Sequence, residues 1–267
     1  MRSKWQLSCC SLVTLNLSDR QDANKVDSMK IDRMPTSQPA QIKPTQLKAT
    51  ETLANGNITA EVCTNETCAT ETLVYDIRRS RYLNITGRCT LRCAFCPKHN
   101  GSKQIHEYQL ALSHQPKPKE IITLLGNVED FEEYVFCGYG EPTLNLPTLL
   151  AVAKEIKRRG GRVRVNTDGL GNLVHRRNIL PELAECVDAL SISLNADNEA
   201  AYNQHCRPKL AGSYAAVNAF IALAPHYIER VQVSAIEGLE GVDIDLCREQ
   251  ILASDCEFKH RVLGALG

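Results

Sequence analysis

Three cysteines in one short run are the residues of this sequence best suited to carry out chemistry. Cys89, Cys93 and Cys96 follow the spacing C-x3-C-x2-C, which supplies three thiolates to one metal centre without a fourth cysteine in the same run. That ligand count suits a [4Fe-4S] cluster with one iron left open to a substrate or cofactor. His99, just beyond the run, offers a fourth ligand of a different kind, so the spacing alone also allows a zinc site.

Strand and helix patterns alternate from residue 75 onward, and they must position these cysteines. Six β-rich runs predict strands over residues 82–86, 134–137, 162–166, 189–195, 231–236 and 258–263, and amphipathic runs predict helices over 119–128, 147–159, 179–186, about 217–224 and 244–253. Repeated strand-helix units imply parallel strands with right-handed crossovers. A closed barrel of eight such units needs roughly 200 residues or more, so we expect an α/β fold, a partial (β/α)6 open TIM-like barrel.

Each unusual motif falls at the carboxyl end of a predicted strand. The cysteine run follows the first strand, Gly138-Tyr139-Gly140-Glu141-Pro142 the second and Asn166-Thr167-Asp168-Gly169 the third, while Ser193-Leu194-Asn195 and Ile236-Glu237-Gly238 end the fourth and fifth. Parallel α/β sheets bind ligands at these ends. Five polar or glycine-rich strand ends at the same end of the barrel therefore predict a cofactor pocket. A zinc ribbon or zinc finger would not need such a pocket.

The first 74 residues differ from the rest in composition. Residues 1–72 are rich in Thr, Asn, Gln, Lys and Ala, and Trp5 is their only aromatic residue. Such a segment buries too little apolar surface to offset the entropy of ordering it. We expect a disordered extension over residues 1–74 and a single domain over 75–267. Cys63 and Cys68, spaced C-x4-C within the extension, could hold a second metal, but isolated thiols are the expectation.

Overall composition limits the partners and the compartment. Lys plus Arg and Asp plus Glu both number 31 among the 267 residues, so no net charge favours nucleic acid. Residues 1–18 contain an apolar stretch broken by polar side chains, which predicts neither a signal peptide nor a membrane span. Twelve cysteines in such a chain indicate reduced thiols and a cytoplasmic location. An organellar transit peptide is the alternative.

Residues 75–267 resemble the radical S-adenosylmethionine (SAM) enzymes, and more narrowly the TatD-family-associated radical SAM proteins. The phrases that carry the resemblance are YLNITGRC at 82–89, FCGYGEP at 136–142, NTDGLGNL at 166–173 and SISLNA at 191–196. The resemblance implies that Cys89, Cys93 and Cys96 hold a [4Fe-4S] cluster whose fourth iron binds SAM. One-electron cleavage of SAM would then give a 5′-deoxyadenosyl radical that abstracts hydrogen from an unidentified substrate.

The resemblance also implies roles for the strand-end residues. The second motif is similar to a Gly-Gly-Glu-Pro element that contacts the methionine amino group, with Tyr139 replacing a glycine of the commoner pattern. The residues implied there are Gly138, Gly140, Glu141 and Pro142. The further SAM contacts implied are Asn166, Asp168, Ser193 and Asn195 at the ribose, Arg207 at the methionine carboxylate and Ile236 near the adenine, while Phe95 either packs near the adenine or shields the cluster. The polar members of this group could instead be helix caps, turn residues or a surface arginine.

Two further functions are alternatives. A non-catalytic iron-sulfur electron carrier would explain the cysteines but leave the strand-end motifs without a purpose. A glycyl-radical-enzyme activase or a 7-carboxy-7-deazaguanine-synthase-like enzyme would share a compact open barrel, although no substrate-specific motif favours either. The expected partner is a one-electron donor of the flavodoxin or ferredoxin type, and the substrate is either a small molecule or a macromolecule.

Overall fold

The protein is described here by a computed structural model, which covers residues 47–52, 58–64, 67–99, 104–105 and 108–263. A three-stranded antiparallel sheet is formed by β1 (Leu47–Thr52), β2 (Ile58–Thr64) and β3 (Thr67–Glu71). A two-stranded antiparallel ladder is formed by β6 (Gln104–Ile105) and β7 (Tyr108–Gln109). All other strands belong to one larger sheet.

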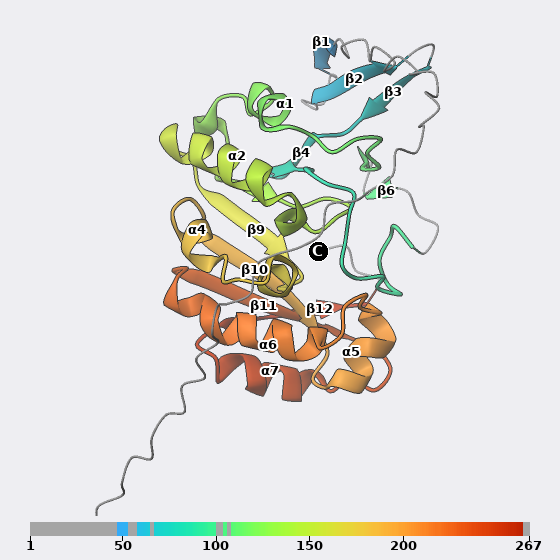
Figure 1. Ribbon diagram of the computed structural model, residues 1–267, viewed down its shortest axis with the longest axis vertical. Coiled ribbons are helices and arrows are strands. Elements are labelled where there is room, and N and C mark those ends of the chain that lie inside the picture. The colour runs from blue at the N-terminus through green and yellow to red at the C-terminus, as the bar shows by residue number, and fades with distance from the viewer. Residues whose placement is uncertain (1–46, 53–57, 65–66, 100–103, 106–107, 264–267) are drawn as a thin grey trace, which may run out of the picture. The chain divides into compact units, whose positions relative to one another are not determined.

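The larger sheet has seven strands in the order β12-β11-β10-β9-β8-β5-β4. Their bounds are β4 (Val74–Ile77), β5 (Ser80–Leu83), β8 (Glu133–Phe136), β9 (Val163–Thr167), β10 (Ala189–Asn195), β11 (Arg230–Glu237) and β12 (Glu257–Val262). The β4–β5 hairpin is antiparallel and every other neighbouring pair is parallel. Figure 1 shows β9, β10, β11 and β12 side by side. All six predicted strands are present, and the open, mostly parallel sheet confirms the predicted partial barrel.

Seven α-helices and three 3-10 helices connect the described strands. The α-helices are α1 (Pro118–Thr123), α2 (Leu146–Arg158), α3 (Gly171–His175), α4 (Leu180–Ala184), α5 (Glu199–Cys206), α6 (Ser213–Leu223) and α7 (Ile244–Leu252), and the 3-10 helices are η1 (Val128–Asp130), η2 (Pro142–Asn145) and η3 (Ala224–His226). The helix predicted to reach residue 128 ends at Thr123, just before Gly126, whose φ of +69° lies outside the helical region. Helices α3 and α5 were not predicted, whereas the helix predicted over 179–186 is present as α4. No helix within the described ranges has the length and apolar content to cross a membrane.

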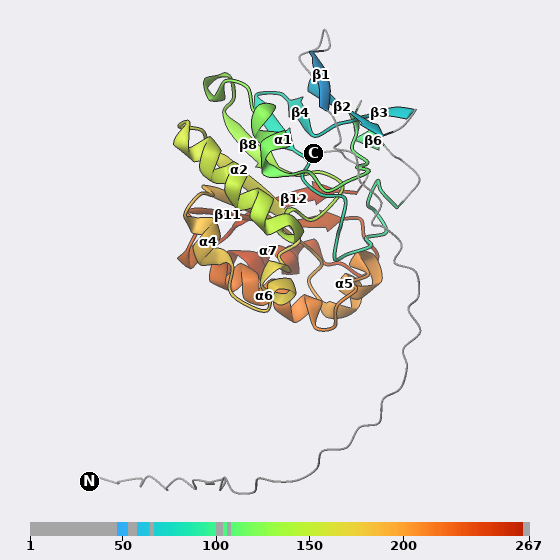
Figure 2. The same ribbon diagram turned by 45° about the horizontal axis from the view of Figure 1, so that its top comes forward.

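Along β9 to β12 the large sheet has one apolar face and one polar face, whereas over β4 and β5 the second face carries an apolar cluster that includes Tyr75 and Tyr82. Side chains alternate along β9 and β10, so that Val163, Val165 and Ile192 are buried in the core while the intervening polar residues are half-buried. Helices α2, α6 and α7 pack on the apolar face, as Figure 2 shows. A parallel sheet usually has two apolar faces, and helices cover both of them. The polar face of this sheet is an exception, and packing of the core does not explain it.

The structure describes strands within part of the segment expected to be disordered, while the division into an extension over residues 1–74 and a domain over 75–267 stays a prediction. Strands β1, β2 and β3 lie within this segment, and β4 begins at Val74. The segment is polar, which predicts disorder, but it is also rich in Thr, a β-branched residue that favours strands. In addition, Leu73 and Val74 are buried in the main core. The expectation for residues 1–46 falls outside the described residues.

Candidate cluster and cofactor site

The cysteine run forms a loop directly after β5 that is tied to a distant segment. The backbone N–H of Arg92 donates to the carbonyl oxygen of Cys206 at 3.0 Å, and that of Ala94 donates to the carbonyl of His205 at 2.8 Å. Within the loop, the N–H of Cys96 donates to the carbonyl of Cys93 at 3.1 Å. These bonds fix the loop against the end of α5 and so fix the positions from which its thiols project.

The three predicted ligands are partly exposed free thiols. Burial, followed by the nearby charge of Asp168, raises the pKa of Cys89 to about 12. A hydrogen bond to the sulfur of Cys206 and burial raise the pKa of Cys93. Neighbouring thiols contribute to both shifts, so the side chains lie within electrostatic range of one another. A bound metal lowers thiol pKa values and makes thiolates, so a cationic centre would compensate for this environment.

A single metal ion and a four-iron cluster need different arrangements of ligands. Among the residues with described side chains, no three His, Cys, Asp or Glu groups converge closely enough to hold one metal ion. Zinc needs four ligands within about 2.0–2.3 Å of one point, and His99 is exposed on the loop. A four-iron cluster instead takes one ligand at each of three separate corners. Three neighbouring thiols that do not share one centre are compatible with that requirement.

Glu141, which follows β8, is buried and surrounded by donors from its own chain. One carboxylate oxygen, Oε1, accepts from the N–H of Thr143 at 3.0 Å, the Thr143 hydroxyl at 2.7 Å and the Thr167 hydroxyl at 2.8 Å. The other oxygen, Oε2, accepts from the N–H of Asp168 at 2.7 Å. Burial and the charge of Asp168 raise the pKa of Glu141 to about 8, although these donors act in the opposite direction. Its carboxylate therefore links the ends of β8 and β9, while its predicted contact with the methionine amino group stays a prediction.

The two glycines before Glu141 allow close contact with the β5 end. A Cβ on Gly140 would lie 2.3 Å from the carbonyl oxygen of Thr86 and 2.4 Å from that of Arg88. A Cβ on Gly138 would lie 2.0 Å from the side-chain oxygen of Asn84. The N–H of Glu141 also donates to the Arg88 carbonyl at 2.7 Å. The glycine motif thus packs against the base of the cysteine loop, a contact with the chain itself that the sequence did not reveal.

Asp168 and Asn166, both predicted at the ribose, have different surroundings. Asp168 is buried, and its carboxylate accepts hydrogen bonds from the hydroxyl of Thr90 in the cysteine loop and from the N–H of Leu170. Burial raises the pKa of Asp168. Asn166 accepts from a guanidinium nitrogen of Arg164 at 2.7 Å on the polar face of the sheet. Asp168 thus supports the loop, and Asn166 belongs to the sheet surface below it.

Two buried polar atoms beside the loop have no hydrogen-bond partner among the described residues. Asn195 ends β10 with a positive φ of 67°, and its amide nitrogen donates to the sulfur of Cys206 at 3.7 Å while its oxygen is unpaired. The hydroxyl of Tyr202 is the second unpaired atom. The charges of Cys206, Asp168, Cys93 and Cys89 all contribute to the raised pKa of Tyr202, after burial. The unpaired Asn195 oxygen suits a hydroxyl group of a ligand, which fits the predicted cofactor.

The remaining predicted residues are placed around this edge less closely. Pro142 begins η2, Ser193 is half-buried on β10, Ile236 is buried near the end of β11, and Phe95 packs against the main core. Arg207 is exposed and lines an open pocket of about 660 Å³ together with Arg92 and Lys209. Lys209 was not predicted, yet its ammonium donates to the Cys89 carbonyl at 2.8 Å. Thr90, Cys206 and Tyr202 were also missed as parts of the site, because only the folded chain brings them together.

Comparisons with known proteins agree with this geometry. The model of the radical SAM superfamily matches residues 83–236, more than half of the chain. The chain is 31% identical over 118 residues to a tungsten-containing aldehyde ferredoxin oxidoreductase cofactor-modifying protein of Pyrococcus furiosus, covering 43% of this chain but only 30% of that protein's length.

Solved structures show the same fold. Streptococcus suis SuiB bound to its precursor peptide SuiA has a TM-score of 0.56 at 11% identity, over 72% of this chain and 40% of that one. SuiB bound to S-adenosylmethionine has a TM-score of 0.51 at 11% identity, over 69% and 40%. The chain therefore belongs to the radical SAM superfamily of enzymes, whose members bind a [4Fe-4S] cluster and S-adenosylmethionine.

Proposed function

We propose that Cys89, Cys93 and Cys96 hold the cluster and that the strand ends beside them bind SAM. When bound, the two cofactors supply a 5′-deoxyadenosyl radical that abstracts hydrogen from the substrate. The observation that carries this assignment is the loop itself. Three neighbouring thiols project from a backbone fixed by two hydrogen bonds to residues 205 and 206 and by the contact between Thr90 and Asp168.

The chain's own residues then position the cofactor and support the loop. Asn195 offers an unpaired buried oxygen to a ribose hydroxyl, with Ser193 and Asn166 on the adjoining face. We further propose Ile236 and Phe95 as the adenine contacts. Glu141 and Asp168 hold the ends of β8 and β9 against the cysteine loop, because their carboxylates accept the hydrogen bonds that connect these segments.

The test is anaerobic reconstitution with iron and sulfide, followed by reduction with dithionite in the presence of SAM. We expect 5′-deoxyadenosine to form, and Cys89→Ala, Cys93→Ala and Cys96→Ala each to abolish both the cluster absorbance and this product. Cys63→Ala and Cys68→Ala serve as matched controls and should keep both. Full iron retention in the triple variant would refute the ligand assignment, and a cluster that never supports cleavage would favour the electron-carrier alternative.

An acidic electron donor fits the surface around the loop. Five exposed cations surround it, and we call them the basic rim: Arg88, Arg92, Lys98, Arg207 and Lys209. Glu199 is the single acidic residue lining the pocket that Arg92, Arg207 and Lys209 share. Since complementary charge accelerates docking, we propose a flavodoxin or ferredoxin type of donor. Arg207 also remains the proposed partner of the methionine carboxylate.

The donor proposal can be tested without knowing the substrate. The double variant Arg88→Glu and Arg92→Glu should slow 5′-deoxyadenosine formation when a flavodoxin supplies the electron, with a smaller effect at high salt. Formation with dithionite, a small reductant, should be unchanged. Equal slowing with both reductants would instead show that the substitutions damaged the cluster site.

We infer finer features from the same residues. The four sequence phrases support membership in the TatD-associated group, against the activase and deazaguanine-synthase alternatives. The free thiols with described side chains support a reducing compartment such as the cytoplasm. The substrate itself is not identified by these motifs.

A further inference from the structure

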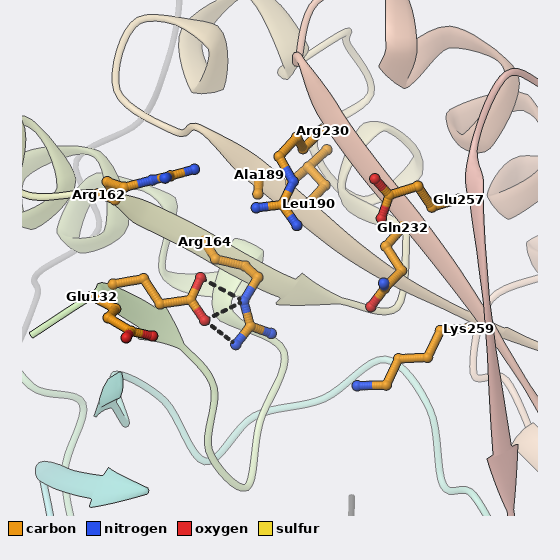
Figure 3. A pocket seen from close by; sticks show the side chains of 10 residues that line it. Glu132, Arg162, Arg164, Ala189, Leu190, Arg230, Gln232, Glu257 and Lys259 are labelled. Carbon is orange, nitrogen blue, oxygen red and sulfur yellow. Dashed lines mark hydrogen bonds and ion pairs between the residues drawn. The ribbon is translucent and has the colours of Figure 1, made fainter. Parts of the chain in front are cut away.

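The polar face of the large sheet lies below the proposed cofactor edge and is hollowed. A cavity of about 350 Å³ is lined by the starts of β8, β9, β10, β11 and β12, and Figure 3 shows the side chains that line it. Along β12, Lys259 lines this cavity, whereas Phe258 points to the opposite face, where the guanidinium of Arg248 in α7 lies 4.7 Å from its ring centre. Because strand side chains alternate, Arg261 shares the face of Lys259.

The two halves of this polar face differ in how their side chains are paired. In the half formed by β5, β8 and β9, Arg164 binds both carboxylate oxygens of Glu133 at 2.8–3.2 Å and also contacts Asn166. Ser80 donates to the same glutamate at 3.3 Å. In the half formed by β10, β11 and β12, eight polar side chains have neither a hydrogen bond nor an ion pair with the described residues: Ser191, Ser193, Arg230, Gln232, Ser234, Glu257, Lys259 and Arg261.

The register places Lys259 and Arg261 at defined heights on the sheet. Ser193, Ser234 and Lys259 form one row across β10, β11 and β12, and Ile236 and Arg261 form the next row toward the strand ends. Two residues along a strand span about 7 Å. Lys259 therefore lies one row below Arg261, and Arg261 is level with the residue proposed to contact adenine.

Positive charge exceeds negative charge around the cavity. Arg164 is neutralised by Glu133, and Glu132 pairs with Arg79, so Glu257 alone remains to offset Arg162 and Arg230. Lys259 and Arg261 add to this excess of positive charge on the face. Burial, then repulsion from Arg164 and Arg261, lowers the pKa of Lys259. Figure 3 shows Lys259 and Arg164 extending toward the same space from opposite sides.

We propose that Lys259 and Arg261 bind an anionic group of the substrate, a carboxylate or a phosphate, on the polar face directly below the SAM site. The unpaired Gln232 and Ser191, register partners on β11 and β10, would hydrogen-bond the rest of the molecule. A charge-assisted contact of this kind is about twice as strong as a neutral hydrogen bond. This inference rests on the proposed function, because it assigns the substrate class of that site.

The experiment is anaerobic titration calorimetry on the full-length, cluster-loaded protein with two probes, inorganic phosphate and succinate, at constant ionic strength. Binding of phosphate but not succinate would identify a phosphate group, and the reverse a carboxylate. Lys259→Gln and Arg261→Gln should each weaken binding of the preferred probe about tenfold, and Lys259→Arg should largely restore it. Lys154→Gln, which removes an exposed lysine from α2, is the matched control and should bind like the wild type.

Several results would overturn the proposal. One is that the wild-type protein binds phosphate and succinate no more tightly than chloride. Another is that Lys259→Gln and Arg261→Gln bind the preferred probe as tightly as the wild type does. A third is weakened SAM binding in these variants, measured by equilibrium dialysis, which would assign the cations to the cofactor. If the wild-type protein formed no 5′-deoxyadenosine, the proposed function would be contradicted. The substrate proposal would still be tested, because the calorimetric titration does not require SAM cleavage.

Discussion

The cofactor edge and the β10–β12 half of the polar face use polar side chains in opposite ways. At the cofactor edge, the carboxylate of Glu141 is surrounded by four donors from the chain, and Asp168 is bonded to the cysteine loop. On the β10–β12 half, Lys259 and Arg261 have no ion partner among the described residues. The first region is a support whose geometry is fixed by internal hydrogen bonds, and the second is a surface whose bonding capacity is left for a ligand.

Replacing the central acceptor of the cofactor edge should have the largest effect on stability. In Glu141→Ala, the donors of Thr143, Thr167 and Asp168 lose their shared acceptor in a buried site. Each unpaired buried donor costs about 1–3 kcal/mol, so we expect the free energy of unfolding to fall by about 3 kcal/mol or more in urea titrations. Glu229→Ala, at an exposed glutamate, is the control and should change it by less than about 0.5 kcal/mol. Equal effects would contradict the support role of the edge.

The contact between the glycine motif and the cysteine loop should be nearly as sensitive. Gly140→Ala places a methyl group 2.3 Å from a backbone oxygen, so the loop must move. We expect a loss of about 1–3 kcal/mol in unfolding free energy and reduced cluster content after reconstitution. Gly87→Ala lies in the same region with nothing within 4 Å of the added carbon. If both variants load iron equally well, the close approach does not control the loop.

The two halves of the polar face should separate under matched substitutions. Arg164→Gln leaves the half-buried Glu133 without its bidentate partner, so we expect the free energy of unfolding to fall by about 1–2 kcal/mol. The pKa of Glu133, which burial raises but Arg164 holds below its usual value, should rise in the same variant. Lys259→Gln, which breaks no ion pair with the described residues, should change stability by less than about 0.5 kcal/mol. A larger loss for Lys259→Gln than for Arg164→Gln would reverse the comparison.

The smallest effect is expected at the unpaired hydroxyl beneath the loop. Tyr202→Phe removes a buried hydroxyl without a partner among the described residues. Since no hydrogen bond is lost, the cluster-free protein should be as stable as the wild type or slightly more stable. Urea unfolding of the two proteins, both prepared without iron, makes the comparison. A clear loss of stability would show that the hydroxyl is bonded in the folded protein.

The sequence predicted the positions of the strands better than the connections between residues. Strand β10 has the predicted bounds, because apolar and polar residues alternate along it from Leu190 to Asn195. Helix α2 was predicted closely because Pro147 and Gly160 mark its ends. Helix α3 was missed because Gly171 is its only buried residue, and α5 was missed because its buried side includes the polar His205 and the small Ala201. The hairpin partner β4 was missed because its residues followed a segment judged too polar to fold.

At the site, the sequence indicated which residues matter but not what they contact. The cysteine spacing identified the loop from local pattern alone. The contacts of Asp168 with Thr90, of Glu141 with Thr167 and of Arg92 with Cys206 join residues from different strands and helices. These positions are far apart in the sequence and only the fold brings them together, so no spacing pattern could have predicted the contacts. Glu141, which is predicted to contact a ligand, therefore also holds parts of the chain together.

The bonds between the cysteine loop and residues 205 and 206 have a consequence for biosynthesis. About 110 residues separate Cys96 from His205, so during translation, at roughly 5–20 residues per second, the three thiols would emerge about 5–20 seconds before the segment that fixes them. Residues of β12, which complete the sheet, follow later still. The ribosome thus exposes flexible, oxidisable cysteines first, and iron delivery is best timed after α5 has folded.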